Sequence, residues 1–98
     1  MKNISININP DGKGAFALMH GRRVVGRIGI ALLDGELMLL DTVVPCRRKL
    51  FPIGLRILAA AVEYARMHEL KVITVSKFVQ RRFSSHAVLY ADIWEKAF

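Results

Sequence analysis

Three turn signals divide the first 44 residues of this 98-residue chain into pieces of strand length. They are "PDGKG" at 10–14, "HGRR" at 20–23 and "LDGEL" at 33–37, and Asp-Gly in two of them supplies the positive φ that tight hairpins need. The runs between the turns are "ISINI", which alternates apolar and polar residues, then "AFALMH", "VVGRIGIALL" and "ELMLLDTVV". This pattern predicts a four-stranded antiparallel meander. Because the last two runs are so apolar, we expect those strands to be covered on both faces.

The hydrophobic period changes at about Ile53. One face of the segment that follows carries Ile53, Ile57, Ala61, Tyr64 and Ala65, and the opposite face carries Arg56, Glu63 and Arg66. This pattern predicts a helix of about four turns with Pro52 near its first position, where a missing N–H matters least.

A short buried strand is predicted next, at "KVITV" (71–75). A strand–helix–strand connection is a right-handed crossover, so strands 36–44 and 71–75 should be parallel. "SKFVQRRF" then predicts a short helix that Ser84-Ser85 ends, and "AVLYADIW" a last helical or irregular segment. We therefore expect an α+β (α/β) fold in one domain over 1–98: an antiparallel four-stranded meander, a helix crossover to a parallel fifth strand, and one or two short C-terminal helices. Gly26 and Gly29, inside the third strand, are typical of a bulge or a close backbone approach.

Charge is unevenly distributed along the chain. Residues 1–42 carry five Lys or Arg and four Asp or Glu, whereas residues 43–98 carry ten and four, which accounts for most of the net charge of +7. An anionic partner should therefore meet the second half, unless the basic surface serves solubility alone.

Other features exclude several classes of protein. No stretch approaches the ~18 uninterrupted apolar residues of a membrane span, and the N-terminus "MKNISININP" lacks an apolar signal core, so we expect a cytoplasmic protein with no membrane partner. The single Cys46 forbids an internal disulfide and leaves no zinc-site spacing, so no metal is expected.

The start of the long helix carries an unusual charge. Arg47, Arg48 and Lys49 precede it, where acidic residues are preferred, and no Ser, Thr, Asp or Asn stands at the cap. Unpaired N–H groups at a helix start, beside the carboxyl end of strand 36–44, favour an anion. A phosphate-bearing ligand is therefore predicted there.

Several ordered motifs around this helix resemble those of the small, single-domain GNAT acetyltransferases. They are "DTVVP" (41–45), "IGLRIL" (53–58), "EYAR" (63–66), "LKVITV" (70–75) and "SKFV" (76–79), and the resemblance covers roughly residues 15 to 92. It implies a mixed sheet splayed between its fourth and fifth strands, with acetyl-CoA in the wedge. The pantetheine arm would bond to the fourth strand, and loop amides would hold the pyrophosphate.

The resemblance also implies the binding residues. The backbone at Leu40, Thr42, Val43 and Val44 would contact the acyl group and pantetheine, and Arg47, Arg48, Lys49 and the amides near Ile53 and Gly54 would hold the phosphates.

The chain departs from the family pattern at Lys49-Leu50-Phe51-Pro52, which replaces Arg-Gly-x-Gly. Neither Leu50 nor Pro52 has glycine's conformational freedom, and Pro52 has no N–H. Two interpretations remain open here: cationic side chains compensate, or the cofactor site has decayed.

Asp41 and Ser76 are the candidates for chemistry. Asp41 replaces the family's His at the end of the fourth strand; it is either a general base toward an amine or a strand-edge carboxylate paired with an Arg. Ser76 stands where relatives carry a Cys suspected in acyl transfer, and the other interpretation is an N-cap for the following helix. Cys46, beside Arg47, is either a reactive thiol or an ordinary loop cysteine.

These observations lead to a first hypothesis and two alternatives. The first is an acyl-CoA (acetyl-CoA) binding protein, an N-acetyltransferase if active, that acetylates an unknown amine. The second is an inactive GNAT-like module that binds nucleic acid through Arg47, Arg48, Lys49, Lys77, Arg81 and Arg82. The third is a structural or partner-binding subunit, for example a dimer formed through a sheet edge or the terminal "IWEKAF".

Overall fold

A computed structural model describes residues 2–95 of the chain. In chain order its elements are β1 (Lys2–Ile8), β2 (Lys13–His20), β3 (Arg23–Leu33), β4 (Glu36–Val43), the 3₁₀ helix η1 (Arg47–Lys49), α1 (Leu50–Met67), β5 (Lys71–Thr74), α2 (Lys77–Ser85) and α3 (Ala87–Tyr90). The sheet order is β1-β2-β3-β4-β5, antiparallel up to β4 and parallel between β4 and β5. The predicted meander, crossover and parallel fifth strand are confirmed.

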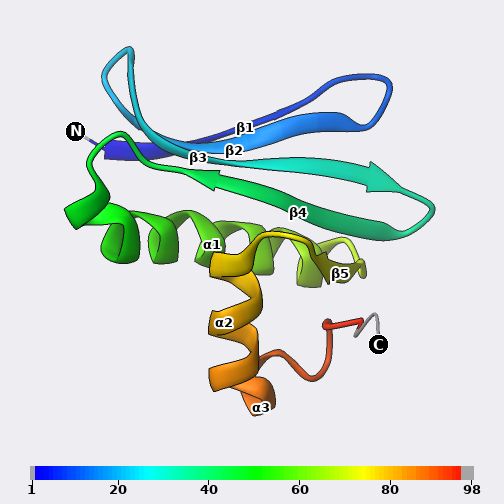
Figure 1. Cartoon of the computed structure of the whole chain (residues 1–98). Coiled ribbons are helices and arrows are strands. Elements are labelled where there is room, and N and C mark those ends of the chain that lie inside the picture. The colour runs from blue at the N-terminus through cyan, green and yellow to red at the C-terminus, as the bar shows by residue number, and fades with distance from the viewer. Residues whose placement is uncertain (1, 96–98) are drawn as a thin grey trace.

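The molecule has two layers, with the helices on one side of the sheet (Figure 1). The core lies between them, where Phe16, Ile28 and Leu37 of the sheet are fully buried, as is Ile57 of α1. The expectation that the later strands are covered on both faces is wrong. On the far face Val43 is 43% exposed and Leu33 59%, because every helix within residues 2–95 packs on the Phe16 side.

Two β-bulges bend the central strands. The register passes from Leu18↔Gly26 to Met19↔Val24, which leaves Val25 as the extra residue of β3. It passes from Gly29↔Asp41 to Ile30↔Leu39, which leaves Leu40 as the extra residue of β4.

The expectation for the two β3 glycines is therefore confirmed, since each lies next to a bulge. Each glycine also lets the side chain of another residue approach the β3 backbone closely. A Cβ on Gly26 would lie 2.7 Å from Cγ2 of Ile53, and one on Gly29 would collide with the Asp41 carboxylate.

Helix α1 starts at Leu50, two residues before Pro52, which was expected near its first position. Pro52 is therefore its third residue, which is tolerated because the N–H groups of the first turn have no intrahelical acceptor. The expected apolar face is confirmed: Ile53, Ile57, Ala61 and Ala65 are buried against the sheet.

The C-terminal segment folds back onto the helices. Helix α2 ends at Ser85, so the break predicted at Ser84-Ser85 is confirmed, and the short α3 follows. Phe83 is fully buried, stacked on Tyr90 with ring centroids 4.0 Å apart and in edge contact with Trp94 at 5.5 Å. This aromatic cluster anchors α2 and α3 to the core. No described helix is both long and apolar enough to cross a membrane.

Candidate functional site

Strands β4 and β5 separate halfway along β4. Their parallel pairing runs from Glu36↔Lys71 to Leu39↔Thr74, and the N–H groups of Val75 and Ser76 both donate to the Leu39 carbonyl, at 3.0 and 2.9 Å. Beyond this point β4 continues to Val43, paired only with β3 within the described residues. The Leu40 bulge lies where the two strands part, because the extra residue increases the local bend and twist of β4. We call this feature the β4–β5 divergence.

The predicted acyl and pantetheine contacts lie along this unpaired edge. Leu40 is 37% exposed and Val43 is exposed, while the Thr42 and Val44 side chains are partly buried. A free strand edge offers backbone N–H and C=O groups to an extended ligand. The residues expected from sequence are therefore together and accessible.

The three cations Arg47, Arg48 and Lys49, hereafter the basic cluster, form η1 and are all exposed. Within residues 2–95 the structure has two ion pairs, Arg27–Asp41 and Arg66–Asp92, and neither uses this cluster. Its charge is therefore available to an anion.

At this helix start, backbone N–H groups are less available to an anion than the cationic side chains are. The Lys49 N–H donates to the Cys46 carbonyl at 2.9 Å, and the Leu50 N–H donates to the Arg47 carbonyl. Pro52 has no N–H. The 3₁₀ turn thus consumes amides that a glycine-rich loop would leave free.

The expectation that amides near Ile53 and Gly54 hold phosphates needs correction. Because α1 begins at Leu50, Ile53 and Gly54 lie after its first three positions. At such positions each backbone N–H donates to the carbonyl four residues earlier and is not free for a phosphate. The Ile53 side chain is 6% exposed, and a Cβ on Gly54 would lie 2.6 Å from Cζ of Phe78. Both residues pack α1 against its neighbours.

Asp41 is paired with an Arg, which is the second of the two arrangements expected for it. Its Oδ2 lies 3.7 Å from Nη2 of Arg27 on the open face of the sheet, and both side chains are about half exposed, at 55% and 46%. It is a surface carboxylate paired with a guanidinium.

Ser76 is buried, at 6% exposure, and stands at the N-cap position of α2. Its hydroxyl makes no capping hydrogen bond; it lies 3.1 Å from the hydroxyl of Thr42 across the β4–β5 divergence. The position expected for a cap is correct, but the side chain ties two diverging segments together.

A groove that sequence reasoning missed lies between the start of α1 and α2. Leu50, Phe51 and Phe78 supply apolar surface, Lys77, Arg81 and Arg82 supply charge, and the volume is about 430 Å³. Phe51 is 61% exposed although it is a large aromatic residue. The spacing of Lys77, Arg81 and Arg82 on one helix indicated a cationic side, but only the fold brings Phe51 beside it.

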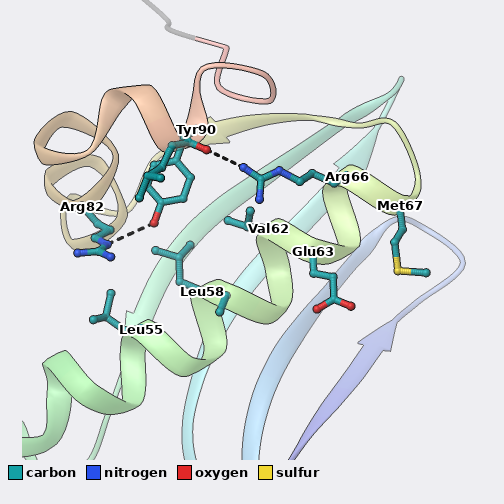
Figure 2. A pocket seen from close by; sticks show the side chains of 10 residues that line it. Leu55, Leu58, Val62, Glu63, Arg66, Met67, Arg82 and Tyr90 are labelled. Carbon is teal, nitrogen blue, oxygen red and sulfur yellow. Dashed lines mark hydrogen bonds between the residues drawn. The ribbon is translucent and has the colours of Figure 1, made fainter.

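A second hollow, about 490 Å³, lies between the outer side of α1 and α3 (Figure 2). Its floor is Leu55, Leu58 and Val62, and its two guanidinium groups are engaged. Arg82 donates to the Tyr90 hydroxyl at 3.2 Å, and Arg66 donates to the Leu89 carbonyl at 2.6 Å. These contacts join the helices, so we assign the hollow a packing role.

Comparison with known proteins agrees with this arrangement. The NMR structure of a Staphylococcus aureus protein, described as a "GCN5-like putative N-acetyltransferase", matches with a TM-score of 0.71 and 22% identity, over 100% of this chain and 94% of that one. No protein-family model and no curated protein sequence matches the chain. At this identity the likeness establishes the fold. The chain has a GNAT-like fold, with the mixed five-stranded sheet of a small acetyltransferase-like domain.

A GNAT-like fold implies acetyl-CoA as cofactor, and the residues present fit it at two places out of three. The unpaired edge of β4 suits an extended pantetheine arm, and the exposed basic cluster suits phosphates. The amide cradle does not fit, because Lys49 and Leu50 bond within the 3₁₀ turn and Pro52 has no donor. The side chains of the basic cluster are therefore the main groups that could hold a phosphate here.

Proposed function

We propose that this protein binds acetyl-CoA or a related acyl-CoA at the β4–β5 divergence and acts as an N-acetyltransferase on an amine acceptor. The observation that carries the proposal is the unpaired edge of β4, which three residues separate from the exposed basic cluster. The GNAT-like fold supports it further.

The acyl-CoA would lie along Leu40, Thr42, Val43 and Val44, with its phosphates on the basic cluster. Arginine suits this role because its planar guanidinium can form two parallel hydrogen bonds to a phosphate. Charge-assisted contacts of this kind would replace the glycine-loop amides. The bound thioester would supply the acyl group, while the chain's own residues position it beside the acceptor.

Acceptor chemistry would take place beside Asp41. This carboxylate could remove a proton from an ammonium group only when it is released from Arg27, 3.7 Å away. The Ser76 hydroxyl is engaged by Thr42, and direct transfer to the amine requires no covalent intermediate. We therefore assign Asp41 as the base to test first and Ser76 as a positioning residue.

Thermal unfolding with acetyl-CoA tests the proposal, with 3′-phosphorylated ADP as comparator. A ligand at about 100 times its dissociation constant adds about 2.7 kcal/mol, which raises the midpoint of a domain this small by about 10 °C or more. Both ligands should give the shift, since both carry the phosphates.

The variant Arg47→Ala/Arg48→Ala should lose most of this shift. Lys13→Ala, an exposed cation in the β1–β2 hairpin at the other end of the sheet, is the matched control and should keep it. Absence of a shift with both ligands would overturn the proposal. If binding holds, release of free coenzyme A thiol in the presence of a panel of amines tests transfer, and Asp41→Asn should slow release without reducing the midpoint shift.

A further inference from the structure

The fold places most carboxylates in one half of the molecule and a group of eight cations at the other end. One half of the molecule, away from η1, contains the two hairpins at Asp11 and Asp34, the last part of α1 and the C-terminal segment beside β5 (Figure 1). We call it the acidic half. These elements hold seven of the eight carboxylate residues: Asp11, Asp34, Glu36, Glu63, Glu69, Asp92 and Glu95. The eighth, Asp41, is paired with Arg27.

The other end is cationic. There the β2–β3 hairpin, η1 and α2 meet the start of α1. They carry Arg22, Arg23, Arg47, Arg48, Lys49, Lys77, Arg81 and Arg82, which we call the basic end. None of these cations takes part in an ion pair within residues 2–95.

Two hollows lie on either side of the η1–α1 junction within this end. One, of about 230 Å³, lies against the β2–β3 hairpin, where His20, Arg23 and Lys49 line it. The other is the α1–α2 groove, lined by Phe51, Lys77 and Arg81. Cations thus extend from the hairpin across η1 to α2, which exceeds what the phosphates of one small cofactor require.

Among the aromatic residues beside these cations, Phe51 is the exposed one. It is 61% exposed between the basic cluster and the cations of α2, and its ring meets Phe78 edge-on with centroids 6.4 Å apart. An exposed aromatic face flanked by cations is the arrangement on which unpaired bases stack while their phosphates are neutralised. Arg82 on the groove wall is held by the Tyr90 hydroxyl, 3.2 Å away, so that part of the surface is preorganised.

We propose that the basic end binds single-stranded nucleic acid, with one base on Phe51 and the backbone crossing η1 between the two hollows. The surface specifies no base sequence, because the contacts are phosphates and one π-face. The acidic half opposes wrong docking, since the dipolar charge distribution steers a polyanion to one end. The inference does not depend on acyl-CoA binding.

Fluorescence anisotropy with a labelled mixed-sequence oligonucleotide of about 12 nucleotides tests this. With about four phosphates neutralised, the log–log salt slope should be about −3, so affinity should fall roughly fiftyfold between about 50 and 200 mM salt. Phe51→Ala should weaken binding by about fivefold to a hundredfold, and Phe51→Trp should retain it. Arg48→Ala and Arg81→Ala should each make the slope less steep by about 0.7.

The control is again Lys13→Ala, which removes the same charge from the acidic half. Equal weakening by Lys13→Ala and Arg81→Ala would overturn the proposal, because it would show a response to net charge alone. So would indifference to Phe51→Ala, tighter binding of a duplex, or binding to phosphatidylserine vesicles without binding to the oligonucleotide. Acetyl-CoA binding is scored separately by the midpoint shift, so the failure of one proposal leaves the other readable.

Discussion

The hydroxyl of Thr42 lies 3.1 Å from the hydroxyl of Ser76, and this contact joins β4 to the residue that precedes α2. The two residues are 34 positions apart in sequence and belong to segments that are already diverging. The contact therefore joins the two segments beyond the last paired residues of β4 and β5. Because Ser76 is buried, loss of either partner leaves a polar group without its hydrogen bond.

A double-mutant cycle with Thr42→Val and Ser76→Ala measures this contact. Each single change should lower the free energy of unfolding by about 1 kcal/mol, and the coupling energy should be about 0.5–1.5 kcal/mol. Urea unfolding is the measurement. Strict additivity would mean that the two hydroxyls do not interact. If Ser76 positions rather than reacts, Ser76→Ala should also retain amine-dependent thiol release.

The two glycines of β3 should differ in their tolerance of a methyl group. Gly26→Ala forces the buried Ile53 side chain at the start of α1 to shift, and overpacking of this kind costs about 1–3 kcal/mol. Gly29→Ala meets only the half-exposed Asp41 carboxylate, which can swing away from Arg27 at a cost below about 1 kcal/mol. Chemical unfolding of both variants compares them; an equal loss would contradict the assigned contacts.

Glu36 should make stability depend on pH. A hydrogen bond with Glu95 is the main cause that raises the pKa of Glu36, followed by desolvation and the charges of Glu95 and Asp34. Because the folded-state pKa exceeds the unfolded one, the folded state binds more protons, and stability falls as pH rises through the raised pKa. Glu36→Gln should remove that loss. Unfolding midpoints between about pH 4 and pH 7 test it, with Glu63→Gln, an exposed carboxylate on α1, as the control that should keep it.

The ionisation of Asp92 should affect stability in the opposite direction from that of Glu36: the stabilising contribution should be lost as the pH falls. The hydrogen bond from Arg66, whose Nε lies 3.0 Å from Oδ2, is the main cause that holds the pKa of Asp92 below its usual value. Its contribution is present above the unfolded pKa and is lost as pH falls through the lowered one. Asp92→Asn should therefore lower the midpoint slightly at neutral pH and leave it unchanged in strong acid. A difference that grew on acidification would contradict this assignment.

Much of the fold follows from local chemistry. Asp-Gly at 11–12 and 34–35 forms two of the hairpin turns, with Gly12 and Gly35 at positive φ, and the spacing of Ile53, Ile57 and Ala61 defines the buried face of α1. These signals are visible in sequence because each depends on residues within one turn or one helical repeat. Helix α1 begins about two residues before the expected position near Pro52, because Leu50 and Phe51 carry no capping signal and η1 leads directly into the helix.

The candidate site was predictable only in part. The basic cluster and the end of β4 are contiguous in sequence, so both could be identified, although their role remains a prediction. The exposure of Phe51 beside the cations of α2 could not, because that groove joins segments about 30 residues apart. That no helix of the described part of the chain covers the far sheet face could not be predicted either, since apolar strands with one open face resemble buried ones in sequence.

The sequence by itself determined the order of strands and helices, the crossover and the place of the basic cluster, because periodicity, turn chemistry and charge act over short distances along the chain. Only the tertiary structure decided that the hydroxyl of Ser76 meets Thr42, that the 3₁₀ turn uses the amides of Lys49 and Leu50, and that most carboxylates lie at the end opposite the basic end. These outcomes depend on how the bulged β4 twists away from β5 and on where α1 and α2 pack. Such packing joins residues that no local pattern relates.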